Sequence, residues 1–463
     1  MTLSAYQFEA RQEEERSARL AAYKRHWLYY LGQHEKQLTV RQGQADDNVV
    51  INLARIIVDK GAAFLFGKEV EWELQEGKRT PEEEYLDDVW QRNRKMTFLG
   101  KLGTSGGIYG HEFVKIVPDG ITRGIPRLVS LEPENVTVFW DGDDIDSVWR
   151  YRIEYTAQGR DGRALSRRQD IERADNGVNW TITNWIARGG GRYIPDPDMP
   201  TVPWPYPFAA VVDSQNLPLP GTYYGMSDLD DGDLQDAINY DASKIQRILR
   251  YHAHPKTVAK GMGNADIKIN EDDVVILPGQ DPNMWNLEMQ SDLGAALAFL
   301  DKLTRWEMAQ AGIPDLDPAK VNVGALSGFA LSILYGDLLE KTELKRRTYG
   351  DLIVETNRRL CVIGGYGDDN ICELHWQSPL PNDETSEQVR DQFELDQELV
   401  SKETVQVRRG LDPEVENERI ASEGQARDVA DGNIGAILLR RWETGRGMEA
   451  QQPVQRAQRP ANG

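Results

Sequence analysis

Apolar residues recur at steps of three and four between residues 327 and 360, which predicts one long helix. The stripe contains Leu331, Leu334, Leu338, Tyr349, Leu352, Thr356 and Leu360, and Ser327 can serve as the N-cap. Such a helix extends about 50 Å, more than the width of most single domains. Gly336 and Gly350 inside the pattern suggest kinks or close helix contacts. The polar stretch 340–348, with only Leu344 to bury, is expected to face solvent, a channel or a neighbouring subunit.

Two further helices are predicted before this one, at 227–252 and 293–310. The first has Ser227 and Asp230 as a capping box, and its stripe is Leu234, Ile238, Asp241, Ile245, Ile248 and His252. The second places Leu297, Leu300, Leu303 and Trp306 on one face. Between them, residues 255–289 hold short strand-like runs with Gly- and Pro-rich turns. This order suggests two rods that leave a body, carry a small tip and return.

The first half of the chain changes period. Helices are predicted at 5–31, at 48–67 with Gly67 as C-cap, and at 81–94 with Pro81 in the first turn. From residue 108 to residue 155 the pattern alternates with period two and includes an acidic turn at 141–144, which predicts an antiparallel meander with a hairpin. Further strand-like runs follow at 179–187 and 189–194, after a polar loop rich in Arg and Asp that is expected at 159–176. The Pro-rich segment 195–208 is expected to close this region and to mark a domain boundary, because proline cannot donate to a central ladder.

The C-terminal part begins with a turn at 361–367 and a strand at 371–376. A mostly helical region is predicted at 383–424, followed by a flexible tail at 445–463 rich in Gln, Pro, Arg and Gly.

The composition indicates a globular chain of 463 residues, 40% hydrophobic and 28% charged, with room for two to four domains. No apolar run approaches the ~20 residues of a membrane span, and the first twenty residues are polar, so a cytoplasm-like compartment is expected. Cys361 and Cys372 are predicted to be buried free thiols. The net charge of −21 argues against a protein that grips nucleic acid tightly, although an acidic wall would let a duplex slide past.

Candidate chemistry is sparse. The acidic cluster Asp228, Asp230, Asp231 and Asp233 does not match a calcium-loop pattern, and capping of a helix start is favoured over metal binding. Gly103, Gly106, Gly107 and Gly110 match no phosphate-binding motif, and a turn that enters the β region is the favoured explanation. No signature of a zinc protease, a serine hydrolase or a cysteine nucleophile is present. An enzyme with a dispersed site stays open at this point.

Several stretches together resemble the portal proteins of tailed bacteriophages. NLARIIVDKGAAFLFGKEV at 52–70 looks like their N-terminal helix that ends in Gly, and 107–120 with 126–141 look like their wing strands. GMSDLDDGDLQDAINYDASKI at 225–245 is similar to the start of their first stem helix. The stretch from 311 to 345, with Ser327–Gly328 followed by Ala330–Leu331, is similar to their tunnel loop and long spine helix.

The resemblance implies an α+β portal fold with long stem and spine helices, a β-rich wing, a small α/β clip and a helical crown. The implied parts are the wing at 1–226, the first stem helix at 227–254, the clip at 255–291, the second stem helix at 292–312, the tunnel loop at 313–326, the spine helix at 327–362, the C-terminal wing and crown at 363–444 and the flexible tail at 445–463.

The resemblance also implies a function. Portal proteins form a homo-oligomeric ring, usually a dodecamer, at the capsid vertex of the virion. Double-stranded DNA passes through the channel during packaging and ejection. Expected partners are the terminase large subunit, the major capsid and scaffold proteins and a head-completion or adaptor protein, with no membrane, cofactor, metal or catalytic residue. Assembly is expected in the host cytoplasm. The expected DNA-channel residues are Lys320, Val321, Asn322, Val323 and Gly324.

Two alternatives remain from the residues alone. One is a metal-dependent nuclease that uses the Asp228 cluster. The other is a different ring-forming scaffold protein through which no DNA passes.

Overall fold

The computed structural model describes residues 5–430 with internal gaps. The residues within this range that it does not describe are 41, 43–44, 76–77, 123, 159–163, 175–176, 178, 189–190, 231–232, 254–256, 261–274, 278–282, 287–292, 315–327, 381–383, 398 and 410–412. The chain divides into two compact units, Met1–Pro381 and Asn382–Gly463. Helices and mostly antiparallel strands make the fold α+β, as the sequence predicts.

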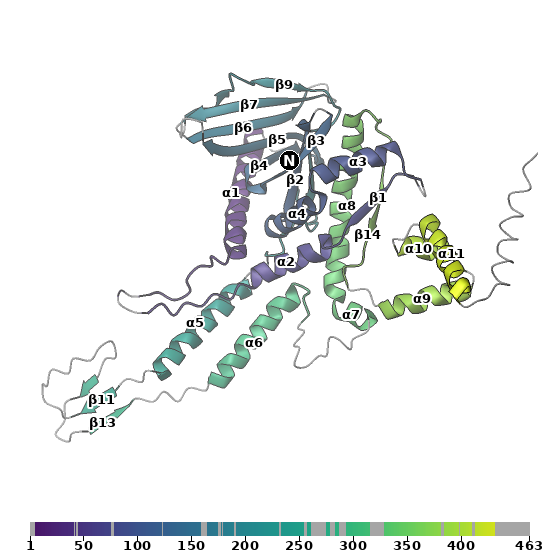
Figure 1. Cartoon of the computed structure of the whole chain (residues 1–463). Helices are drawn as coiled ribbons and strands as arrows, with labels where there is room; N and C mark the ends of the chain where they lie inside the picture. The colour runs from purple at the N-terminus through teal and green to yellow at the C-terminus, as the bar shows by residue number, and fades with distance from the viewer. Residues whose placement is uncertain are drawn as a thin grey trace, which may run out of the picture. The chain divides into compact units, whose positions relative to one another are not determined.

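Four helices build the first part of the larger unit (Figure 1). They are α1 (Ala5–Tyr30), α2 (Leu53–Phe66), α3 (Pro81–Arg92) and α4 (Lys95–Tyr109). The first three confirm the predicted helices, with α2 beginning later because Asn52 caps it by accepting a hydrogen bond from Arg55 N. The predicted Gly67 C-cap is present, and its N–H donates to Ala63 O.

Helix α4 corrects the prediction for the Gly-rich patch. Gly103, Gly106 and Gly107 lie inside this helix, and Gly110 ends it in the left-handed conformation (φ 80°). The expected turn is therefore wrong for all but Gly110. Glycine is unfavourable in a helix interior, by up to about 1 kcal/mol each, so three of them here need a packing reason. The candidate site described below supplies it.

The described strands of the larger unit form four sheets. Their bounds are β1 (Val70–Glu73), β2 (His111–Thr122), β3 (Ile125–Leu131), β4 (Val136–Asp141), β5 (Asp144–Gln158), β6 (Ala164–Arg173), β7 (Trp180–Arg188), β8 (Ile194–Pro195), β9 (Thr201–Trp204), β10 (Val211–Gln215), β11 (Thr257–Lys260), β12 (Val275–Leu277), β13 (Asn283–Asn286) and β14 (Glu373–Trp376). The sheet orders are β1-β14, β10-β2-β3, β12-β11-β13 and β4-β5-β6-β7-β8, with β9 also paired to β7. A short 3₁₀ turn, η1 (Pro133–Asn135), joins β3 to β4.

The meander and its hairpin are confirmed. β4 and β5 pair antiparallel around the acidic turn, and β5, β6 and β7 continue in register. The loop expected at 159–176 is wrong for β6, because the buried Asp170 of this strand is paired with Arg152 and Arg168. The Pro-rich segment contributes two short edge strands to this sheet: β8 and β9 each pair with β7. Pro203 lies on such an edge, where its missing N–H costs no ladder bond.

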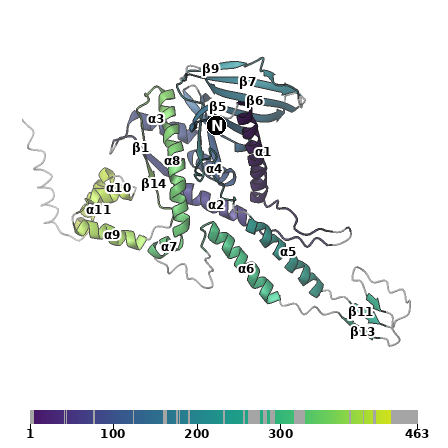
Figure 2. The ribbon, with the colours of Figure 1, turned by 180° about the vertical axis from the view of Figure 1, so that it is seen from behind.

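Two helices, α5 (Asp233–Ala253) and α6 (Leu293–Gln310), lie side by side in both views (Figures 1 and 2). Helix α5 begins at Asp233 and not at Ser227, because residues 227–230 form a turn that is bonded to the body of the unit. Along the contact, Ile238 of α5 and Leu303 of α6 are buried together with Leu53.

The long C-terminal helix of this unit is two helices. α7 (Gly328–Leu334) and α8 (Gly336–Gly364) are separated at Tyr335, whose ψ of 13° departs from helical geometry beside Gly336. Leu334, expected in the buried stripe, is 40% exposed at the end of α7. The lower part of the stripe is confirmed, since Leu338, Tyr349, Leu352, Thr356 and Leu360 are buried.

The polar middle of α8 corrects a second expectation. Thr342 and Lys345 are buried, whereas Leu344 is 44% exposed. The expectation is therefore wrong for these two polar residues, whereas Glu340, Glu343, Leu344 and Arg347 are exposed. The reason is tertiary, since a buried carboxylate lies opposite Lys345.

The smaller unit contains three described helices, α9 (Glu384–Asp396), α10 (Lys402–Arg408) and α11 (Pro413–Ala430). Asp391 joins the first two, with Oδ1 2.9 Å from Arg408 Nη1 and Oδ2 2.8 Å from Arg409 Nη2. This agrees with the predicted helical region. Strand β14 pairs with β1 in the larger unit, where a strand was also predicted.

Candidate functional site

The five residues expected to touch DNA, Lys320, Val321, Asn322, Val323 and Gly324, lie outside the described residues. The description ends at Pro314, just after α6, and resumes at Gly328, where α7 begins. Among the described residues, the groups of functional interest lie where α5 begins, along α6 and in the middle of α8.

A buried ion-pair cluster lies between the turn before α5 and the middle of α8. Asp228, with a side chain only 1% exposed, accepts a 2.6 Å contact from Lys345 Nζ and a 3.1 Å contact from Lys341 Nζ. The Lys345 side chain is 2% exposed. Both lysines belong to α8, while Asp228 belongs to the turn that leads into α5. The cluster therefore fastens the start of α5 to the middle of α8.

Each charge keeps the other ionised. Burial would raise the pKa of Asp228, but Lys345 and Lys341 bring that pKa below its usual value. Burial lowers the pKa of Lys345, and Asp228 opposes this effect. A buried pair of this kind is costly to break, because removal of one partner leaves a charge without water or a counter-charge.

The turn 227–229 is also bonded to the end of α4. Ser227 Oγ lies 2.8 Å from both Gly107 O and Ile108 O, and Asp228 N donates to Gly107 O at 2.8 Å. These carbonyls belong to the last turn of a helix, where no partner exists within the helix itself. The turn thus satisfies the C-terminus of α4 while it positions the Asp228 carboxylate.

The unexpected glycines make room for the cluster. A Cβ on Gly107 would lie 2.9 Å from Asp228 Oδ2, and a Cβ on Gly61 of α2 would lie 3.2 Å from the same oxygen. A Cβ on Gly106 would overlap the Tyr349 hydroxyl. Glycine is therefore required where α2 and α4 approach α8. The spacing of 103, 106 and 107, which would place them on one face of a helix, was the signal in the sequence for a close approach on that face, although it does not identify the partner.

The acidic cluster proposed from the sequence is divided by the structure. Asp228 binds lysines, and Asp230 Oδ2 accepts a hydrogen bond from Ser227 N at 2.7 Å. The side chains of Asp231 and Asp233 lie outside the description. Asp230 therefore caps the 227–230 turn and not the first turn of α5. The predicted capping role is correct, but the capped element is a turn before the helix. An Asp228 carboxylate saturated by two ammonium groups is not available to a metal ion.

Helix α6 presents large apolar side chains that the described part of its own chain does not bury. Leu297, Phe299 and Trp306 are 52%, 51% and 47% exposed. The expected single face of Leu297, Leu300, Leu303 and Trp306 is wrong, because steps of three drift by about 60° per step in an α-helix. Leu297 and Trp306 therefore project on opposite sides, and only the middle of the set meets α5.

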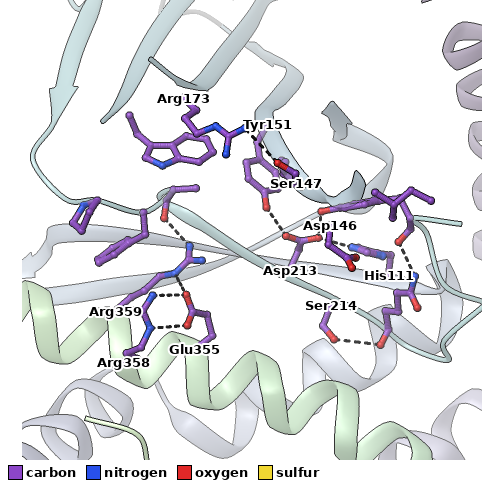
Figure 3. Close-up of a pocket in the computed structure, with 18 of the residues that line it drawn as sticks. His111, Asp146, Ser147, Tyr151, Arg173, Asp213, Ser214, Glu355, Arg358 and Arg359 are labelled. Atoms are coloured by element: carbon purple, nitrogen blue, oxygen red, sulfur yellow. Dashed lines mark hydrogen bonds and ion pairs between the residues drawn. The ribbon is translucent and has the colours of Figure 1, made fainter. Parts of the chain in front are cut away.

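A cavity of about 560 Å³ lies between the β4–β9 sheet and α8 (Figure 3). Asp213 of β10 lies at its centre, and its carboxylate accepts hydrogen bonds from Tyr151 at 2.7 Å and from Tyr223. His111 Nε2 lies 2.9 Å from the same carboxylate. Burial would raise the pKa of Asp213, but these three partners bring it below its usual value.

The cavity does not have the geometry of a nucleophilic site. The hydroxyl of Ser214 donates to Thr348 O at 2.8 Å and not to His111. Arg359 donates to the carbonyls of Ala209 and Val211, and it pairs with Glu355 at 2.7 Å. The polar groups are used to fasten β10 to α8, so the arrangement is structural.

The described residues contain neither a candidate metal site nor a candidate membrane span. No group of three or more His, Cys, Asp or Glu side chains there could hold a metal ion. Among the helices whose residues are described, none is long and apolar enough to cross a membrane.

Comparison with known proteins gives the following. A search of curated proteins returns no match. One solved structure, "Neck of empty GTA particle computed with C6 symmetry", is similar at a TM-score of 0.42 and 15% identity over 78% of this chain and 90% of that chain. The family model "Phage portal protein, SPP1 Gp6-like" matches residues 10–175 and 226–428. The match covers most of the described chain, including α2, α4, the Asp228 turn and α8, and the chain therefore belongs to this family of phage portal proteins, which are structural proteins and not enzymes.

Proposed function

We propose that the chain forms a closed ring of identical copies, twelve in number, at one vertex of the capsid in the virion. The observation that carries the proposal is the uncovered apolar surface of α6, where Leu297, Phe299 and Trp306 need a partner that the described part of their own chain does not provide. Membership in the portal family supports it. Head-to-tail contacts between identical subunits close into rings when the rotation between neighbours permits.

The ring serves as the conduit for double-stranded DNA. In this proposal it docks the terminase large subunit during packaging, contacts the major capsid and scaffold proteins during assembly in the host cytoplasm, and binds a head-completion or adaptor protein afterwards. The formal charge of −21 per chain suits a surface past which a duplex must slide, since few phosphate contacts mean a weak grip.

The parts of the chain take the following roles. Residues 1–226 are wing, α5 and α6 are stem helices, the sheet of β11 to β13 belongs to the clip, and α7 and α8 are the spine. Residues 363–444 complete the wing and form the crown, and 313–326 are the tunnel loop. The Asp228 cluster then joins the first stem helix to the spine.

The expected DNA contact is the segment 320–324, Lys320 above all. One lysine per copy would form a belt of positive charge in an acidic channel, which touches phosphates without a salt-sensitive grip. Lys320→Ala should leave ring formation intact and change the amount of DNA packaged or retained. Lys78→Ala, in an exposed loop, is the matched control. Equal packaging and retention by wild type and Lys320→Ala would remove this residue from the mechanism.

The ring itself is tested on the purified chain. Light scattering should give a mass many times that of one 52.4 kDa chain, and negative-stain images should show rings with a central hole. A stable monomer at micromolar concentration, with no rings in the images, would contradict the proposal. Packaging with empty proheads then separates a DNA conduit from a ring through which no DNA passes.

A further inference from the structure

The outer face of α8 forms a ridge that the described residues of its own chain leave uncovered. Glu340, Leu344, Arg347 and Asp351 are all exposed, and at 100° per residue they fall within about 60° of one another on the helix. The opposite face carries the buried Lys345 and Tyr349. We call these four exposed residues the α8 ridge.

A large groove lies on the far side of α4. Its volume is about 1160 Å³, and its lining includes Phe66, Thr104, Ser105, Ile108, Leu128 and Trp27. Four charged residues also line it: Lys101, Arg127, Glu132 and Glu134. All four are exposed. We call this cavity the α4 groove.

The ridge and the groove point in opposite directions. On α4, residues 103, 106 and 107 turn toward the layer that holds Tyr349 and Asp228, whereas Lys101, Thr104, Ser105 and Ile108 line the groove. The two sets are centred about 180° apart on the helix. Because α8 also turns its ridge away from α4, one copy offers a ridge on one side of this layer and a groove on the other.

The edge of the groove has unused bonding groups. β3 is the outer strand of the β10-β2-β3 sheet, and residues 127, 129 and 131 face 113–117 of β2 in the ladder. The alternation of a strand then turns the backbone groups of residues 128 and 130 outward. Leu128 N donates to Asn93 Oδ1 at 2.9 Å, and Ser130 N points away from β2 on the same edge of the sheet. The groove therefore offers hydrogen-bond groups beside its apolar floor.

The charges of the two surfaces are complementary. Glu340 and Asp351 flank Arg347 on the ridge, and the groove has two cations and two carboxylates at its rim. None of these seven side chains forms an ion pair with another described residue. Leu344, 44% exposed, is the apolar side chain of the ridge that an apolar floor would cover.

We propose that the α8 ridge of one copy docks into the α4 groove of the next copy, and that this is the head-to-tail contact repeated around the ring. The inference rests on the proposed ring and names the surfaces that build it. A contact between two different surfaces of one chain is heterologous, and it closes when the rotation between copies divides a full turn. Arg347 then meets Glu132 or Glu134, and Glu340 and Asp351 meet Lys101 or Arg127.

Engineered cysteines test the contact in the full chain. The two pairs are Lys101→Cys with Leu344→Cys, and Glu134→Cys with Arg347→Cys. A disulfide needs Cβ atoms about 3.5–4.5 Å apart, which the opposite directions of ridge and groove exclude within one chain. The native Cys361 and Cys372 are buried, and burial raises the pKa of Cys361 to about 12, so neither should react.

Mild oxidation should give a ladder of covalent oligomers on a non-reducing gel for at least one pair, and none for the single cysteine variants. Leu344→Cys with Asp143→Cys, at the exposed β4–β5 turn, is the matched control and should stay monomeric on the gel. Arg347→Glu should raise the protein concentration for half-assembly by about tenfold or more, and Glu134→Arg in the same chain should recover most of it.

Rings in wild-type images with no ladder from either pair would overturn this contact and leave the ring in place. A wild-type chain that stays monomeric would overturn the ring, and this contact with it.

Discussion

Two helix contacts of the larger unit are built in opposite ways. Where α8 meets α2 and α4, glycines let the backbones approach and a buried Asp228–Lys345 pair fills the space. Where α6 meets α5, one narrow face is buried and Leu297, Phe299 and Trp306 stay half exposed. The first contact is complete within one chain. The second is incomplete. The comparison distinguishes residues that stabilise the single subunit from residues that we expect a neighbouring subunit to cover.

The strongest way to break the complete contact is Asp228→Asn. Lys345, which is almost fully buried, would lose its counter-charge, and the free energy of unfolding should fall by about 3–5 kcal/mol. Urea denaturation followed by circular dichroism measures it. Asp230→Asn is the control, because Asp230 caps a turn with a more exposed carboxylate and Asn can cap as well. Equal, small losses for both variants would show that the buried pair does not hold the joint.

A second test fills the space that the glycines leave. Gly106→Ala should cost about 1–3 kcal/mol, because its Cβ would overlap the Tyr349 hydroxyl. Gly100→Ala on the same helix has nothing within 4 Å of the added carbon and should be neutral or stabilising, by up to about 1 kcal/mol. Thermal unfolding of the two variants provides the comparison. If Tyr349→Phe in the Gly106→Ala chain restores no stability, the overlap is not the cause.

The pH dependence of the complete contact depends on Glu112, which is fully buried beside Gly106 and Tyr349. Burial raises the pKa of Glu112 well above its usual value, against a smaller opposite effect of the Ser105 hydroxyl. The unfolded chain therefore releases this proton at lower pH than the folded chain. Stability from the neutral carboxyl is fully present below the unfolded pKa and is lost as pH rises toward the folded pKa.

Glu112→Gln removes this dependence. The unfolding free energy of Glu112→Gln minus that of wild type should grow with rising pH, by up to about 1.4 kcal/mol per pH unit above the unfolded pKa. Denaturation at several pH values between 5 and 8 measures the slope. A constant difference across this range would mean that Glu112 has the same pKa in both states.

A substitution on the exposed side of the incomplete contact should affect ring formation more than the stability of the monomer. Trp306→Glu is expected to change the unfolding free energy of the monomer by no more than about 0.5 kcal/mol, because the side chain is already half exposed. It should nevertheless reduce ring formation measured by light scattering. Leu303→Glu on the buried side of α6 is the contrast and should destabilise the chain itself. Normal rings from Trp306→Glu would place this side chain outside the subunit contacts.

The sequence by itself determined which segments become helices and strands over most of the chain. Periodic burial fixed α1, α2, α3, α5, α6 and the strands β2 to β5 and β7, because a stripe or an alternation of apolar residues favours one type of secondary structure. It missed β6, whose many charged residues predict a loop. The family resemblance also came from the sequence, since it depends on the order of the motifs.

Only the tertiary structure decided which faces meet. The sequence has no sign that Lys345 lies against Asp228, 117 residues away, so this lysine is buried within a polar stretch that should be solvated. It also cannot show that Gly106 lies against Tyr349, and without that contact three glycines indicate a turn and not a helix. Leu297 and Leu334 are apolar in the sequence whether their own chain or a neighbour covers them. Burial depends on the distance between segments that are far apart along the chain, and hydrophobic periodicity has no information about that distance.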